Sequence, residues 1–260
     1  MGDISTSVTV VIPARYGSSR FPGKPLAMLA GKPLIQHVYE RAKACPEISR
    51  VVVATDDVRI RDAVKEFGGT VLMVEGPFRT GTDRVAAVAR QLPGHVFVNL
   101  QGDEIALHPA LFADLIVPFL HSGAGIGTLK RRLASADEVA NPGVVKVVAN
   151  QQGEALYFSR APIPYLRDGR VGDASLGLHY VHLGIYIYTR ETLMRFADLP
   201  TGQLEEAEKL EQLRALEHGV PIRVWETIHP SLRIDTSEDL QNASAVLEQK
   251  PEADLEVRRA

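Results

Sequence analysis

Short apolar runs alternate with amphipathic segments along the first part of the chain. Four runs, the first of which reads VTVVI, are typical of buried strands, and they lie at 8–12, 51–54, 70–74 and 95–104. The segments between them carry apolar residues at helical spacing, which predicts helices over 32–45, 57–69 and 82–92. This alternation predicts a parallel sheet with helices packed on its faces.

Particular residues mark the ends of the predicted helices. Pro33 suits the first turn of the first helix. Gly68 and Gly69 stop the second helix, and Thr82 is a candidate N-cap for the third. The third helix therefore starts within the segment TGTDR.

The second half of the chain is less regular, and it has no internal repeat. Strands are predicted at 143–150, 154–165, 181–189 and 221–228, and helices over 205–219 and 237–250. The segment 162–178 is rich in Pro, Gly, Asp and Arg, which predicts a loop. We expect one domain over 1–250, with a smaller region at about 151–205, and a frayed tail at 251–260.

Polar residues gather just beyond the predicted strands. PARYGSSR follows the first strand, TDD follows the second, and QGDE closes the fourth. Ligands of parallel α/β sheets bind beyond the carboxyl ends of the strands. These segments are therefore the candidate binding site.

The loop after the first strand is both flexible and strongly basic. It contains Gly17 and Gly23, and it carries Arg15, Arg20 and Lys24. Glycines let the backbone approach a ligand, and consecutive N–H groups bind anions. A polyphosphate is the natural occupant of such a loop, and the alternative is a solvated basic loop without a ligand.

The loop matches neither of two common phosphate-binding motifs, the Walker loop and the dinucleotide fingerprint. The fingerprint requires more closely spaced glycines and little charge. Five residues separate Gly17 from Gly23, and Pro25 follows Lys24, whereas a Walker loop has four residues between its glycines and a hydroxyl after its lysine. Because that hydroxyl would bind magnesium, a metal must be held elsewhere. Asp103 is one candidate ligand and Asp235 a second, although either aspartate could instead cap a helix or occupy a turn.

Composition excludes several classes of protein. The chain has 260 residues, 45% of them hydrophobic, and a net charge of −3, which gives no general attraction to nucleic acid or to an anionic membrane. No apolar run approaches the ~20 residues that cross a bilayer. The single cysteine, Cys45, is read as a small apolar residue near a helix end. We expect a cytoplasmic enzyme without an export signal.

Several motifs in order resemble the 3-deoxy-manno-octulosonate cytidylyltransferase family, also called CMP-Kdo synthetases. They cover about 8–240 and read VVIPARYGSSRFPGKPLAMLAGKPLIQHVYERA, VVVATDD, RTGTDR, NLQGDE, VKVV, ALYFSRAPIPY, HLGIYIY and KLEQLR. The resemblance implies a Rossmann-like α/β nucleotidyltransferase fold with a mainly parallel sheet and a smaller dimerisation and acceptor-binding region. It implies transfer of CMP from CTP to 3-deoxy-manno-octulosonate (Kdo) with release of pyrophosphate, a magnesium requirement and a homodimer.

The resemblance also assigns roles to residues. For catalysis it implies Lys24, Arg15, Arg20 and Asp103, and for the metal it implies Asp103 and Asp235. We expect the nucleotide to contact Ala14, Arg15, Gly17, Ser18, Lys24, Thr80, Gly81, Thr82 and Arg84. By resemblance the acceptor residues are Gln101, Arg160, His182, Tyr186, Glu211 and Gln212.

Several of these residues have a structural alternative. Thr82 and Asp83 could form a helix cap, and the two roles are compatible. Among the acceptor residues, Arg160 and His182 are expected to face the acceptor's carboxylate, and Glu211 and Gln212 its hydroxyls. His182 could instead be a strand histidine, Tyr186 a core aromatic, and Glu211 one charge on a solvated helix.

The sequence departs from the family pattern at two positions. Ile105 stands where the family reads QGDEP, and SLRIDT at 231–236 replaces a longer segment ending in GVDT. The second departure adds Arg233 beside the candidate metal ligand. An alternative function is therefore cytidylyl transfer to another acid, such as 8-amino-Kdo, a sialic-acid-like sugar or phosphonoformate. A further alternative is a catalytically inactive nucleotide-binding regulator.

Overall fold

The computed structural model describes residues 7–17, 21–104, 108–167, 177–229, 231, 234, 236 and 238–241. Its strands are β1 (Val8–Pro13), β2 (Met28–Leu29), β3 (Lys32–Pro33), β4 (Arg50–Thr55), β5 (Val71–Met73), β6 (Val96–Asn99), β7 (Ile126–Arg132), β8 (Lys146–Ala149), β9 (Ala155–Ser159), β10 (Tyr180–Thr189) and β11 (Arg223–Glu226). Its helices are η1 (Lys24–Leu26), α1 (Leu34–Lys43), α2 (Val58–Glu66), α3 (Gly81–Gln91), α4 (Pro109–Ser122), α5 (Ala136–Ala140), α6 (Arg190–Asp198), α7 (Gln203–Glu208) and α8 (Leu213–Glu217).

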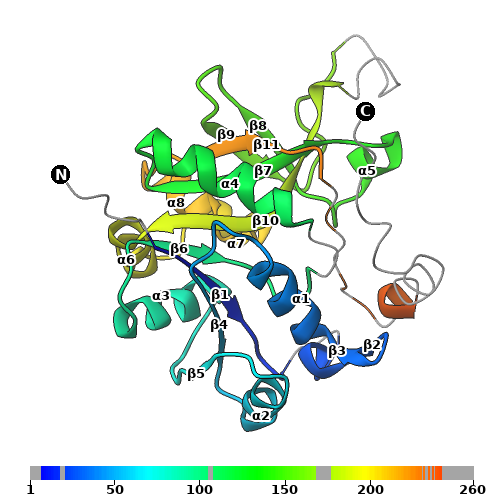
Figure 1. Ribbon diagram of the computed structural model, residues 1–260. Helices are drawn as coiled ribbons and strands as arrows, with labels where there is room; N and C mark the ends of the chain where they lie inside the picture. Colours follow the sequence, from blue (N-terminus) through cyan, green and yellow to red (C-terminus); the bar gives the residue numbers. More distant parts are fainter. Residues whose placement is uncertain are drawn as a thin grey trace.

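A mixed sheet forms the centre of the protein (Figure 1). Its main path runs β11-β7-β10-β6-β1-β4-β5, and the β8–β9 hairpin joins it through β10. The strands β6, β1, β4 and β5 pair in parallel, as the sequence predicts. β10 is antiparallel to both β6 and β7, so its first residues lie at the edge where β6 and β7 end.

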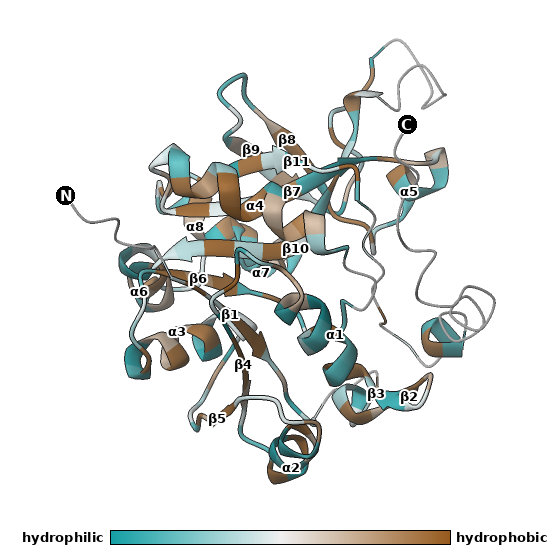
Figure 2. Cartoon of the chain, in the orientation of Figure 1, coloured by the Kyte–Doolittle hydropathy of each residue, from teal (hydrophilic) through white to brown (hydrophobic). Residues whose placement is uncertain are grey.

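Helices cover both faces of this sheet (Figure 1). On β1, Val10 and Ile12 pack into one apolar cluster with residues of α1, α2 and α4, whereas Val11 packs into a second cluster with residues of α3, α6 and α8. Successive side chains of a strand point to opposite faces, so a β-branched run fills both layers. Figure 2 shows the result, a largely hydrophobic sheet between helices with one hydrophilic side.

Most of the predicted elements are present, with shifted ends. The first three predicted helices correspond to α1, α2 and α3, and Pro33 is the N-cap of α1 rather than a residue of its first turn. The helix α4 and the strand β7 were not predicted. Within the expected smaller region at about 151–205, β9 pairs with β8, and β10 lies between β7 and β6 in the main path. The tail at 251–260 and nearly all of the helix predicted over 237–250 lie outside the described residues.

The prediction of one helix over 205–219 is wrong. The segment forms two short helices, α7 and α8, and Lys209 between them has a left-handed backbone with φ of 53°. Helix-forming residues fill this segment, and no Gly or Pro interrupts it. The break therefore depends on contacts from elsewhere in the fold.

The N-cap predicted for α3 is also wrong. Thr80 is the N-cap, and a capping box joins the Thr80 hydroxyl to the N–H of Asp83 and the Asp83 carboxylate to the N–H of Thr80. Thr82 is fully buried instead. TGTDR contains two threonines in succession, so the pattern alone did not show which one starts the helix.

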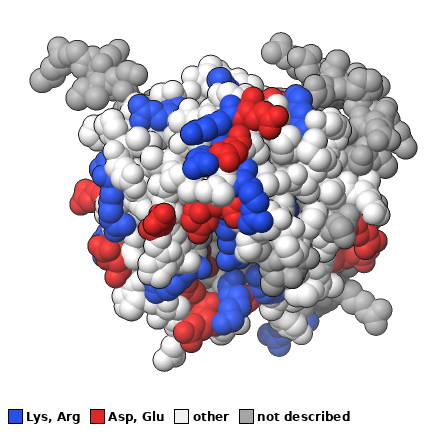
Figure 3. Space-filling model, turned by 90° about the horizontal axis from the view of Figure 1, so that it is seen from below, with Lys and Arg blue, Asp and Glu red and all other residues white. Residues whose placement is uncertain are grey.

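The remaining surface and core agree with an ordinary globular protein. Cys45 is buried, and burial raises the pKa of its thiol to about 12. Among the described residues, no helix is both long and apolar enough to span a bilayer. On the face seen in Figure 3, Lys and Arg side chains are interspersed with Asp and Glu.

Candidate active site

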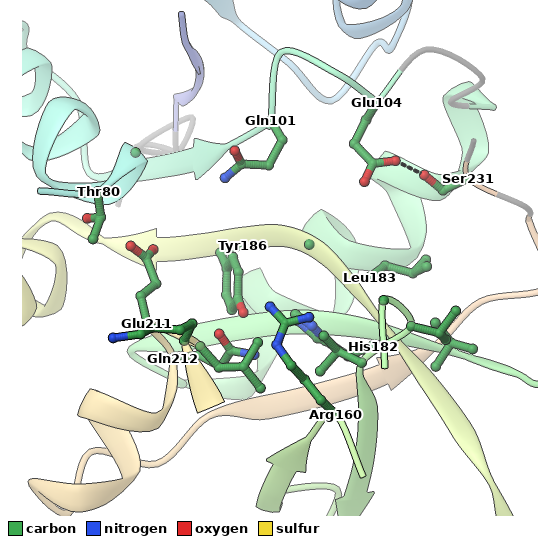
Figure 4. Close-up of a pocket in the computed structure, with 18 of the residues that line it drawn as sticks. Thr80, Gln101, Glu104, Arg160, His182, Leu183, Tyr186, Glu211, Gln212 and Ser231 are labelled. Carbon is green, nitrogen blue, oxygen red and sulfur yellow. Dashed lines mark hydrogen bonds between the residues drawn. The ribbon is translucent and has the colours of Figure 1, made fainter. Parts of the chain in front are cut away.

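A cavity of about 450 Å³ opens at the edge where β6 and β7 end and β10 begins. Figure 4 shows how its walls come together from distant parts of the chain. Thr80 lies at the start of α3, Gln101 follows β6, and His182 and Tyr186 belong to β10. All six predicted acceptor residues line this cavity: Gln101, Arg160, His182, Tyr186, Glu211 and Gln212.

A smaller hollow of about 150 Å³ adjoins the cavity. Both are lined by Thr80, Gly81 and Gln101, so they share a wall. Five further residues, which follow β1 or lie around the start of α3, also line the hollow: Ala14, Arg15, Phe78, Arg79 and Arg84. Two adjoining spaces can hold two substrates side by side.

Five of the nine predicted nucleotide residues line the smaller hollow, but three of the described ones do not. Ala14, Arg15, Thr80, Gly81 and Arg84 line it. Lys24 is one of the three that do not, since it lines neither space. Thr82 is buried behind it, and Gly17 is exposed and lines neither space. Ser18 and Arg20 lie outside the described residues.

Lys24 joins the basic loop to the segment that follows β6. Its Nζ donates to Asp103 Oδ2 at 2.7 Å and to the main-chain oxygen of Ile234 at 2.8 Å. Gly23, the residue before Lys24, has a left-handed backbone with φ of 71°. A Cβ at this position would lie 3.2 Å from the Tyr16 ring. Only glycine fits that position without strain.

The surroundings of Asp103 fit a metal in part. Asp103 is 8% exposed, and its main-chain oxygen accepts the N–H of Ile234 at 3.0 Å. The residue before Asp235 therefore lies directly against Asp103, while Asp235 itself lies outside the described residues. A carboxylate such as that of Asp103 is the kind of oxygen donor that magnesium prefers. Within the described residues, no group of three His, Cys, Asp or Glu side chains is arranged to hold a metal ion.

Glu211 is partly buried and lines the cavity beside the wall that the two spaces share. Asn99 Nδ2 donates to Thr82 Oγ1 at 3.0 Å, and the Thr82 hydroxyl therefore donates to Glu211 Oε1. Burial raises the pKa of Glu211, against the lowering effect of this hydrogen bond and of Arg214. The solvated-helix alternative for Glu211 is thus excluded, because the residue lies in the turn between α7 and α8.

His182 is neutral because it is buried. Desolvation lowers its pKa to about 3. Its Nε2 lies 3.0 Å from Thr128 Oγ1, and the single Thr128 proton goes to the main-chain oxygen of Ile185 at 2.7 Å. His182 Nε2 must then carry a proton, which leaves Nδ1 as a hydrogen-bond acceptor. His182 consequently adds no positive charge to the cavity.

Arg160 supplies positive charge to the cavity. Its guanidinium group points into the cavity in Figure 4, and within the described residues it forms no salt bridge. The neighbouring Arg131 also lines the cavity but pairs with Glu138 at 2.6 Å. Arg160 is therefore the cavity arginine whose charge is left for an anion.

Four polar or charged residues of the cavity were not predicted: Arg131, Lys209, Glu104 and Ser231. Glu104 accepts a hydrogen bond from the Ser231 hydroxyl across the cavity mouth (Figure 4). This contact joins the segments QGDEI and SLRIDT, which are the two departures from the family pattern. The departures themselves were a signal that could have identified Glu104 and Ser231, whereas nothing local indicated Lys209.

Comparison with known proteins agrees with this geometry. Residues 9–228 match the family model described as cytidylyltransferase. The 3-deoxy-manno-octulosonate cytidylyltransferase of Syntrophotalea carbinolica is 51% identical over 93% of this chain and 98% of its own, and that of Geobacter sulfurreducens is 50% identical over 90% and 97%. A solved CMP:2-keto-3-deoxy-manno-octonic acid synthetase complexed with CTP is 42% identical, covers 94% of this chain and 99% of its own, and superposes with a TM-score of 0.87.

The sheet and the paired spaces at its carboxyl edge thus define a nucleotidyltransferase of the cytidylyltransferase class. The sequence identities of 50% and 51%, over nearly the full length of the chain, indicate one family within that class. The chain belongs to the 3-deoxy-manno-octulosonate cytidylyltransferase family.

Proposed function

We propose that the protein transfers CMP from CTP to the anomeric hydroxyl of Kdo and releases pyrophosphate. The acceptor hydroxyl oxygen forms a bond to the α-phosphorus of CTP, the bond from that phosphorus to the β-phosphate oxygen breaks, and the hydroxyl proton passes to solvent. The observation that carries this proposal is the shared wall of Thr80, Gly81 and Gln101 between the two spaces. Substrates held on the two sides of this wall meet in a fixed orientation, which lowers the entropy cost of the reaction.

The nucleotide is assigned to the smaller hollow. Backbone groups near Ala14 and the short residues Thr80 and Gly81 suit the edge of a cytosine ring. Arg15, with Ser18 and Arg20 of the same loop, suits the triphosphate. Lys24 suits it as well, because a cation there offsets the charge that develops on the leaving pyrophosphate.

Magnesium is assigned to Asp103 and Asp235. Asp103 is nearly buried, and Ile234, the neighbour of Asp235, donates its N–H to the Asp103 main chain. When bound, magnesium would neutralise phosphate charge and lower the pKa of a nearby hydroxyl. Lys24, held at 2.7 Å from Asp103, adds a second positive charge at the same place.

The acceptor is assigned to the larger cavity. Arg160 binds the carboxylate of the acceptor, because its charge is not neutralised within the described residues. The sequence-based expectation placed His182 at the carboxylate too, but a neutral histidine with Nδ1 as acceptor suits a sugar hydroxyl better. Glu211, Gln212 and Tyr186 suit the remaining hydroxyls.

Initial rates of pyrophosphate release test this proposal. With magnesium, the protein is assayed with CTP, UTP or ATP against Kdo, and with CTP against a sialic acid and phosphonoformate. Fast release that needs both CTP and Kdo is the expected result. Release with CTP and every acid except Kdo would contradict the acceptor assignment and leave the nucleotide assignment in place.

A second candidate function is cytidylyl transfer to an 8-amino analogue of Kdo. The observation that favours it is the contact between Glu104 and Ser231, which places a buried carboxylate at the cavity mouth. A carboxylate there would suit an ammonium group on the far end of the acceptor. Adding 8-amino-Kdo to the same assay decides between the two, since the second candidate requires a higher kcat/KM for the amino sugar.

A homodimer in the cytoplasm completes the proposal. Large apolar side chains are exposed on β9 and near the segment that follows it: Leu156 is 61% exposed, Leu178 59% and Tyr165 86%. Exposed apolar groups of this size favour contact with another surface. A reduced, buried Cys45 is compatible with the cytoplasm.

A further inference from the structure

A buried lysine lies directly behind the acceptor cavity. Lys146 on β8 is fully buried, and its ammonium group donates to the main-chain oxygens of Asn141 at 3.0 Å, Val144 at 2.7 Å and Arg160 at 2.6 Å. An ammonium group has three donors, and all of them are used. Since Val144 and Arg160 line the cavity, Lys146 joins two of its walls from behind.

Glu208 holds the same arginine from another side. Its carboxylate accepts the Arg160 main-chain N–H at 3.0 Å and the Ser159 hydroxyl at 2.6 Å. Its main-chain oxygen accepts Arg160 Nε at 2.8 Å, while Arg160 Nη1 donates to the main-chain oxygen of Pro142 at 2.9 Å. Both the backbone and the guanidinium group of Arg160 are thus fixed, and carbonyl partners leave its charge unneutralised.

Glu208 also sets the position of the turn that carries Glu211 and Gln212. It is the last residue of α7, and the left-handed residue Lys209 follows it. Its contacts with Ser159 and Arg160 tie the end of α7 to the end of β9. The arginine on one wall and the acidic turn on the other are therefore held by one network.

We propose that Lys146 and Glu208 are positioning residues, which do not touch the acceptor but aim Arg160 at the acceptor's carboxylate. Glu208 also holds the turn of Glu211 and Gln212 towards the acceptor's hydroxyls. This inference rests on the proposed function only in naming these groups of the acceptor. A group held in advance by buried hydrogen bonds loses less conformational freedom when its ligand binds. Removing either residue should thus weaken acceptor binding and leave the nucleotide site intact.

Two variants test the proposal, Lys146→Met and Glu208→Ala. Each should raise the acceptor KM by about tenfold or more, with kcat and CTP affinity changed by less than about threefold. The matched controls are Lys43→Met and Glu206→Ala, which remove exposed side chains from α1 and α7 and should change nothing. A fall in CTP affinity as large as the rise in the acceptor KM would mean a general folding defect. That result would overturn the proposal.

A double-mutant cycle tests whether Lys146 acts through Arg160. If it does, Lys146→Met added to Arg160→Ala should raise the acceptor KM by less than about twofold beyond Arg160→Ala alone. Fully additive effects would overturn the proposal. Glu208→Ala provides a second, independent cycle with Arg160→Ala.

A third measurement does not depend on the acceptor's identity. The Arg160 Nε–H resonance, assigned by its loss in Arg160→Ala, should exchange slowly with water in the unmodified protein and at least about tenfold faster in Glu208→Ala and Lys146→Met. Unchanged exchange would overturn the positioning role. An unmodified protein that shows the protected resonance but no turnover of Kdo would instead contradict the proposed function and leave the positioning role standing.

Discussion

At the scale of single residues, burial decides which charge each group of the acceptor cavity carries. His182 is held neutral, and the pKa of Glu211 is raised. Carbonyl oxygens rather than carboxylates accept the hydrogen bonds of the Arg160 guanidinium group, so no salt bridge offsets its charge. Thr82 belongs to this set as well, since its hydroxyl reaches Glu211 and not the nucleotide hollow. A small number of buried contacts thus gives the cavity one positive wall.

The lowered pKa of His182 predicts an acid-sensitive contribution to stability. Its pKa falls from 6.5 to about 3 on folding, so between these pH values the unfolded chain binds one more proton than the folded chain. Stability from this group is complete above pH 6.5 and is lost as the pH falls towards 3. Between about pH 6.5 and 4.5 the unmodified protein should lose about 2 kcal/mol more stability than His182→Asn.

Urea unfolding at the two pH values measures this difference. The exposed His95 offers a matched control, because His95→Asn should lose stability in parallel with the unmodified protein. Equal losses in the unmodified protein and in His182→Asn would mean that His182 is not held neutral.

We expect that removing the charge of Asp103 reduces turnover without reducing nucleotide binding. Asp103→Asn keeps the shape of the side chain and removes its charge, so Lys24 loses its anionic partner, as would the proposed magnesium. Turnover should fall by at least about a hundredfold, since metal-centred charge stabilisation contributes several kcal/mol. The kcat and the CTP dissociation constant are measured together, with the surface variant Asp62→Asn as control. Retention of more than about a tenth of the activity would remove Asp103 from the mechanism.

At the scale of elements, the turn between α7 and α8 matters most for the site. Local propensity in EEAEKLEQLRALEHG favours one helix, and the actual break at Lys209 comes from tertiary contacts. Glu205 pairs with the fully buried Arg214, and Glu208 bonds to the end of β9. Glu211 and Gln212 reach the cavity only because of this break, so a sequence-based reading can name them without placing them.

Substitutions of Lys209 test this break directly. Lys209→Gly and Lys209→Val remove the same charge, but only glycine adopts a left-handed backbone without steric cost. The Val variant should be about 1–2 kcal/mol less stable than the Gly variant and should have the higher acceptor KM. In a continuous helix the order of stability would be reversed, because glycine is the poorer helix former. Thermal unfolding of the two variants distinguishes these cases.

The parallel half of the sheet could be predicted from the sequence because its strands are short apolar runs with polar ends. The motifs at those ends, including QGDE and TGTDR, named the three residues of the wall that the two spaces share, Thr80, Gly81 and Gln101. Two features could not be predicted in this way. The strand at 181–189 was predicted, but its antiparallel position between β6 and β7 is set by pairing over long sequence separations. The choice of Thr80 over Thr82 as N-cap depends on the burial of Thr82.

At the scale of the whole molecule, exposed apolar side chains predict self-association. The protein should elute with a mass near twice the 28.4 kDa of one chain. Leu156→Asp should shift it towards the monomer, because a charge on β9 would have to be desolvated in the interface. Leu120→Asp on α4, which also replaces an exposed leucine, is the control and should leave the mass unchanged. Light scattering that gives one chain at every concentration would contradict the homodimer.

The proposed reaction joins a cytidylyl group to an acidic sugar across the shared wall of two spaces. Phosphorus NMR and mass spectrometry of the products formed from CTP, Kdo and magnesium test this reaction. We expect equal amounts of pyrophosphate and of a CMP ester at the anomeric carbon of Kdo. CTP consumed to free CMP and pyrophosphate without the ester, or CTP left intact beside Kdo, would contradict it.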